Sequence, residues 1–162
     1  MKVVSFNGDS EDELLRTAAC LEEHFPHSMA KAVVDVAKKK SLDHEEKHSK
    51  VEYIVAHGIS TQLEGKKTII GSHHFVFEDE KCHIPEGKEK LFEQLPLEHS
   101  HLYLAIEGEL AAVICIEDPL REEAADAIRA LKESGISKVV MMMGDSDRTA
   151  RAIAERVGVD QY

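Results

Sequence analysis

Residues 102–116 read LYLAIEGELAAVICI, two short aliphatic runs on either side of Glu107-Gly108. Two such runs joined by a two-residue turn with glycine in second place predict an antiparallel β-hairpin. Earlier in the chain, a similar turn at Glu64-Gly65 lies among three runs rich in β-branched residues, 51–55, 59–63 and 67–70. The sequence therefore predicts an antiparallel sheet.

Helices are predicted before and between these hairpins. Ser10-Glu11-Asp12-Glu13 is a capping box, and apolar residues then recur at helical spacing, which predicts a helix from Ser10 to Glu23. A second helix is expected from Ser28. We also expect a strand at 2–5, a charged loop at 41–50, irregular structure at 73–85 and a brief helix at 87–95.

The pattern changes after Ile116. Asp118-Pro119 predicts the start of a helix that Gly135 ends. An apolar strand from Val139 to Met143 is followed by Gly144-Asp145 and another helix, and this βαβα order is typical of a parallel doubly wound sheet. The predicted fold is α+β, an antiparallel sheet with flanking helices in residues 1–113, followed by a partial α/β βαβα segment in residues 114–162.

Composition narrows the possible functions. The 162 residues include 31 Asp and Glu against 20 Lys and Arg, a net charge of −11, which argues against binding nucleic acid through general electrostatic attraction. No apolar stretch approaches the roughly 20 residues that cross a bilayer. Three cysteines with no CxxC pair fit a reducing compartment, so we expect a cytosolic setting.

Two motifs occupy the places where ligands collect in doubly wound sheets, beyond the carboxyl ends of the strands. A lone Gly-Asp after a strand is as often an ordinary turn as a phosphate-facing site. Together, however, GDSDRTARAIA at residues 144–154 and DPLRE at residues 118–122 resemble the phosphorylation domain of P-type ATPases, which belong to the haloacid-dehalogenase-like superfamily. This resemblance implies that Asp145 lies near the transferred phosphoryl group.

The N-terminal half resembles the nucleotide-binding domain of heavy-metal P-type ATPases. In EEHFPHSMAKAVV at residues 22–34, Glu22 and His27 match the glutamate and histidine that contact adenine in that family. VAHGI at residues 55–59 is similar to the family's Gly-x-Gly turn, with Gly58 as the second glycine, and Gly71-Ser72 matches its Gly-Asn. Taken alone, His27 would be a surface or capping residue, and both glycines would be turn residues.

The resemblance implies a fragment of a larger transporter that binds ATP with Mg²⁺ and delivers the γ-phosphate to an aspartate. No Asp-Lys-Thr-Gly-Thr or Gly-Asp-Gly-x-Asn-Asp segment occurs, so the nucleophile and most Mg²⁺ ligands are expected outside this chain, which should bind ATP without turnover. The implied partners are membrane and actuator domains, at the cytoplasmic face of a membrane. A parallel sheet without its first strand also suggests some self-association.

Several positions depart from the family pattern and keep two alternatives open. The departures are Pro26, Ser28, Ala56, Ser72 and Met143. A regulatory module that has lost nucleotide binding would agree with those at Ala56, Ser72 and Met143. A haloacid-dehalogenase-like phosphatase would need its own nucleophile, for which only Asp9 is available.

A metal site is not predicted, because neither His44 with His48 nor the group His73, His74, Cys82 and His83 has the spacing of a structural zinc site.

Overall fold

The computed structural model describes residues 1–24, 28–42, 52–54, 58–96, 99–117, 121–142 and 147–162. They form two compact units, one of Met1–Leu95 with His101–Ile116 and the other of Pro96–Ser100 with Glu117–Tyr162. The predicted division at residues 113 and 114 stays a prediction. In the described part of the chain, no helix is both long enough and apolar enough to cross a membrane.

The first unit is built on a six-stranded sheet with the order β1-β6-β5-β4-β3-β2. The turns of both predicted hairpins have two residues with positive φ, 51° at Glu64 and 81° at Gly65, then 53° at Glu107 and 85° at Gly108. Such turns match the twist of the flanking strands, so the predicted antiparallel sheet is confirmed. The strands are β1 Lys2–Ser5, β2 Glu52–Ile54, β3 Gly58–Leu63, β4 Lys66–Gly71, β5 Ser100–Ile106 and β6 Glu109–Ile116.

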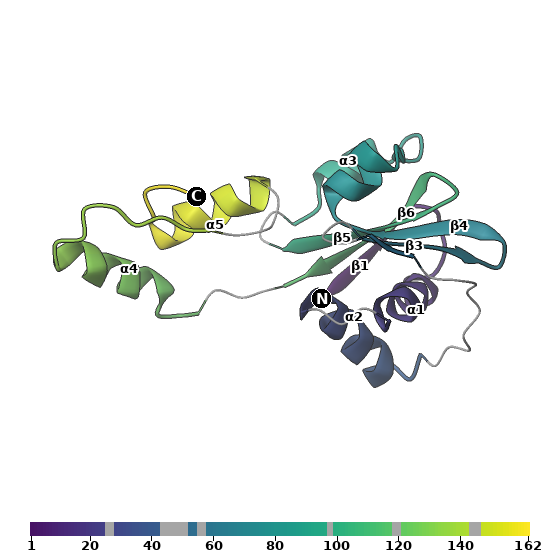
Figure 1. The fold of residues 1–162 in the computed structure, drawn as a ribbon, viewed down its shortest axis with the longest axis horizontal. Helices are drawn as coiled ribbons and strands as arrows, with labels where there is room; N and C mark the ends of the chain where they lie inside the picture. The colour runs from purple at the N-terminus through teal and green to yellow at the C-terminus, as the bar shows by residue number, and fades with distance from the viewer. Residues whose placement is uncertain (25–27, 43–51, 55–57, 97–98, 118–120, 143–146) are drawn as a thin grey trace. The chain divides into compact units, whose positions relative to one another are not determined.

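Two longer helices, α1 (Glu11–Glu22) and α2 (Ser28–Lys39), cover one face of this sheet (Figure 1). The Ser10 side chain accepts a hydrogen bond from the Glu13 backbone N–H at 3.2 Å, as the capping box predicts. Apolar side chains of α1 and α2 form a first core cluster with residues of the sheet, among them Leu14, Leu15, Leu21, Val33, Ile59, Ile70 and Leu104.

The other face carries a π-helix, η1 (His74–Asp79), and the short helix α3 (Glu89–Glu93). The expectation of irregular structure from His73 to Pro85 is therefore wrong for η1. Burial of Phe75 and Val76 in a second core cluster outweighs the weak helical propensity of the local sequence. This cluster also contains Phe6, Ile69, Tyr103 and Leu110.

The second unit contains α4 (Ala124–Glu133) and α5 (Asp147–Val157). Gly135 and Gly158 follow these helices with φ of 98° and 77°, as expected for glycines that end helices. A parallel bridge joins Val140 to Gln161, so the backbone returns alongside itself after α5, in the manner of a βαβ unit.

Two details of this unit differ from the prediction. The helix α4 begins at Ala124, whose N–H donates to the Arg121 carbonyl in a preceding turn, and the predicted start at Asp118-Pro119 lies outside the described residues. The predicted strand from Val139 is reduced, over the residues the structure describes up to Met142, to the single bridge at Val140. A strand depends on a ladder of partners, and one bridge does not make a ladder.

Candidate functional site

The hairpin of β3 and β4 brings together three residues that the sequence singled out. Gly58 is the first residue of β3 and Gly71 the last residue of β4, and the two are direct partners in the antiparallel register. Ser72 follows Gly71 in the chain. One end of this hairpin therefore presents two adjacent glycine backbones and a hydroxyl.

Glu22 comes to the same region from the helical layer. It is the last residue of α1, and α1 contacts β3. The residue before it, Leu21, lies in the first core cluster with Ile59 and Ile70, which are the neighbours of Gly58 and Gly71. The segments that carry Glu22 and the glycine pair thus share one core.

The Glu22 side chain is buried, which is unusual for a carboxyl group. Its residue is only 2% exposed, and this burial raises the pKa of the carboxyl to about 7. The next residue, Glu23, lies on the surface, 3.8 Å from the Lys38 ammonium group. A pKa near 7 means that Glu22 can either accept hydrogen bonds as a carboxylate or donate one as an acid at neutral pH.

Gly58 has a packing role that the sequence did not reveal. A Cβ atom at this position would lie 2.5 Å from the Ile70 carbonyl oxygen and 2.7 Å from Phe75 Cε1, with Phe75 Cδ1 closer still. Real Cβ contacts are not this short, so only glycine fits without a shift. The space that a side chain would take is filled by the protein itself, while contact of the Gly58 backbone with a nucleotide stays a prediction.

Ser72 supports the element that provides this aromatic ring. Its hydroxyl accepts a hydrogen bond from the Phe75 N–H at 3.2 Å, and its carbonyl accepts one from the Val76 N–H at 3.1 Å. Phe75 was missed by the sequence reasoning. The one local signal that could have suggested its helix is a serine three residues before an apolar run, the spacing of a side-chain cap.

The remaining predicted site residues are not placed by the structure. His27 and Asp145 lie outside the described residues, as do Pro26, Ala56 and Met143. Ser28 is the first residue of α2. The roles assigned to Glu22, His27, Gly58, Gly71, Ser72 and Asp145 therefore stay predictions.

Asp9, the nucleophile of the phosphatase alternative, lies in an exposed turn after β1. Its carboxylate accepts a hydrogen bond from Asn7 Nδ2 at 2.6 Å. The preceding strand is at the edge of the sheet and pairs antiparallel with β6. This is not the end of a parallel strand, where ligands collect in doubly wound folds.

Two of the histidines that were considered for a metal site, and for which none was predicted, lie beside carboxylates. His74 Nδ1 lies 3.0 Å from a Glu78 carboxylate oxygen, and His83 Nε2 lies 3.1 Å from a Glu109 carboxylate oxygen. His44 and His48 lie outside the described residues. Across the described ranges, no group of three or more His, Cys, Asp or Glu side chains is arranged to hold a metal ion.

Comparison with known proteins places the chain in a family. A sequence profile of the haloacid dehalogenase-like hydrolases matches residues 9–162, and the chain belongs to this family. It is also 30% identical over 161 residues to a zinc-transporting ATPase of Synechocystis sp., an alignment that covers 99% of this chain and 21% of the relative. The resemblance to heavy-metal P-type ATPases is thus confirmed, and the chain spans about a fifth of that relative's length.

Solved structures agree with this assignment. A zinc-transporting PIB-type ATPase in an E2.Pi state matches with a TM-score of 0.66 and 26% identity, over all of this chain and 26% of the transporter. The N-domain of HMA8, a copper-transporting P-type ATPase, matches with a TM-score of 0.61 and 25% identity, over 72% of this chain and 98% of the domain. The predicted fold class, an antiparallel α+β unit followed by a haloacid-dehalogenase-like segment, is confirmed.

Proposed function

We propose that this chain is the ATP-binding part of a heavy-metal cation-transporting P-type ATPase. It would hold ATP for phosphoryl transfer to an aspartate that this sequence does not contain. The observation that best supports this function is the pairing of Gly58 with Gly71, beside a core shared with the segment of the buried Glu22. Buried ionisable groups of raised pKa gather at functional sites more often than elsewhere.

In this proposal the adenine base is held by two side chains. The Glu22 carboxylate accepts a hydrogen bond from the exocyclic amine, and the His27 imidazole packs against the purine ring. Gly58 and Gly71 form the wall near the ribose and phosphates, with the Phe75 ring filling the space that a side chain at Gly58 would take. The Ser72 hydroxyl already accepts from Phe75 N–H, and its own proton is suited to a ligand oxygen.

For Asp145, the proposal is a place near the transferred phosphoryl group in the whole protein. Mg²⁺ bound with ATP would neutralise phosphate charge during the transfer. The described residues offer no cluster for this ion, so we assign it to the phosphates and to ligands beyond those described here. No step of the proposal depends on residues of this chain holding the metal.

In the whole transporter the partners would be its membrane and actuator domains, with this chain at the cytoplasmic face. Phosphorylation and its reversal would change the ion affinity of the membrane part through domain motion.

We also propose weak self-association, because several apolar side chains of the second unit are exposed. These are Leu131, Ile136, Val140 and Met142.

Isothermal titration of the chain with ATP tests the binding function, and GTP provides a matched control. Guanine carries a carbonyl oxygen where adenine carries its amine. At pH 8, above the Glu22 pKa of about 7, Glu22 is mostly a carboxylate that opposes guanine, and we expect GTP to bind about tenfold more weakly. No heat with either nucleotide would refute the proposal. Phosphate release from a phosphate ester, abolished in Asp9→Asn, would instead support the phosphatase.

A further inference from the structure

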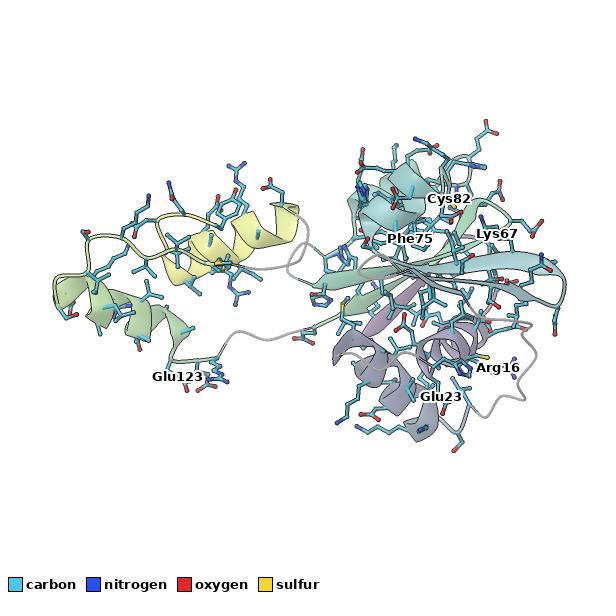
Figure 2. The ribbon with its side chains drawn as sticks, viewed as in Figure 1. Arg16, Glu23, Lys67, Phe75, Cys82 and Glu123 are labelled. Atoms are coloured by element: carbon cyan, nitrogen blue, oxygen red, sulfur yellow. The ribbon has the colours of Figure 1, made fainter. Side chains whose placement is uncertain are left out.

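We propose that Phe75 is a positioning residue of the ATP site. From η1 its ring holds the start of β3 against β4 and so sets where the Gly58 backbone lies relative to Gly71 and Ser72. This inference rests on the proposed ATP-binding function. Phe75 lies on the sheet face opposite α1 and α2. Figure 2 shows Phe75 on the side of α3 and Glu23 on the other side of the sheet.

Phe75 packs directly and tightly against Gly58. The ring occupies the position that a Gly58 side chain would take, and the Ile70 carbonyl oxygen bounds the same space. Because Gly58 has no side chain, the ring packs against its backbone. A displacement of the ring therefore shifts the backbone of β3 itself.

Backbone hydrogen bonds and packing hold Phe75 and its helix in place. Phe75 is 1% exposed, its N–H donates to the Ser72 hydroxyl at 3.2 Å, and its carbonyl accepts from the Glu80 N–H at 3.0 Å. Another residue of η1, Phe77, packs on Tyr103 with ring centroids 5.6 Å apart. Tyr103 in turn is the strand partner of Gly71.

These contacts connect three of the predicted ATP-contacting residues through η1. The Phe75 ring packs on Gly58, the Phe75 N–H donates to the Ser72 hydroxyl, and Phe77 of the same helix packs on Tyr103, the strand partner of Gly71. A π-helix is rare and is often retained at functional sites, since an ordinary α-helix aims its side chains differently. We infer that η1 presents Phe75 to Gly58 at the geometry that ATP binding requires.

The test compares Phe75→Leu with Phe6→Leu. Both phenylalanines are 1% exposed and belong to the second core cluster, so both substitutions should destabilise the fold to a similar degree. The Phe75 ring provides two of the three atoms nearest to the Gly58 Cβ position, and Phe6 provides none of them. At a temperature where circular dichroism shows both variants folded, we expect ATP affinity to fall about tenfold in Phe75→Leu and less than twofold in Phe6→Leu.

A double-mutant cycle separates positioning from general packing. Gly58→Ala and Phe75→Leu act on one contact, so their effects on ATP affinity should be non-additive, whereas Gly58→Ala and Phe6→Leu should be additive. If either leucine variant fails to fold, Phe75→Met and Phe6→Met replace the pair.

Equal losses of affinity at the two phenylalanines, or additivity in both cycles, would reduce Phe75 to an ordinary core residue. ATP binding by the unsubstituted chain is measured first. Its absence would refute the proposed function and this inference together, while intact binding with equal losses would refute the inference alone.

Discussion

The buried carboxyl of Glu22 makes a quantitative prediction about stability and pH. Burial raises its pKa from the ordinary 4.5 to about 7 in the folded chain. Between these values the unfolded chain has lost a proton that the folded chain retains, so stability falls as pH rises. The favourable contribution of the protonated Glu22 carboxyl to the free energy of unfolding is complete below pH 4.5. It is lost once the pH exceeds about 7.

The size of the effect follows from the two pKa values. Each pKa unit corresponds to about 1.4 kcal/mol, so the change from 4.5 to about 7 is worth about 3 kcal/mol of unfolding free energy. Glu22→Gln has a similar shape and does not titrate. We therefore expect the stability of Glu22→Gln relative to the unsubstituted chain to increase by about 3 kcal/mol between pH 4.5 and pH 8.

Urea unfolding at pH 4.5, 6, 7 and 8 measures this difference. Glu23→Gln is the matched control, because it removes a carboxyl from the next position, where the side chain is 45% exposed. Subtracting the control corrects for the loss of one negative charge at this end of α1. A gap between Glu22→Gln and the unsubstituted chain that is the same at pH 4.5 and pH 8 would refute the burial argument.

Three further predictions concern the site and the second unit. His27→Ala should weaken ATP binding about tenfold, measured by calorimetry, with an unchanged unfolding midpoint, and an unchanged affinity would remove His27 from the site. Gly58→Ala should cost about 1 to 3 kcal/mol in urea unfolding, because its Cβ would overlap Phe75 and the Ile70 carbonyl, and a loss below 0.5 kcal/mol, roughly the range of surface substitutions, would contradict that packing. Sedimentation should show concentration-dependent association that decreases in Val140→Lys, since Val140 is 53% exposed, and a monomer at all concentrations would contradict self-association.

Local interactions explain most of what could be predicted about the fold. The capping box at Ser10 and the turns at Glu64-Gly65 and Glu107-Gly108 involve residues at most a few positions apart, so their geometry can be inferred from the chain itself. The start of α4 and the extent of the strand from Val139 were predicted less well. The extent of the strand depends on Gln161, a partner elsewhere in the chain that a local pattern does not specify, while α4 begins after a turn in which Ala124 N–H donates to the Arg121 carbonyl.

The amino-acid sequence by itself determined the register in which β3 and β4 pair. A two-residue turn at Glu64-Gly65 pairs Leu63 with Lys66, and in the structure the same register continues to Gly58 and Gly71. Only the tertiary structure decided that Phe75 fills the space beside Gly58 and that Glu22 is buried. Both facts depend on side chains packing between layers, and such packing is set by the whole core and not by the spacing of residues along one strand or helix.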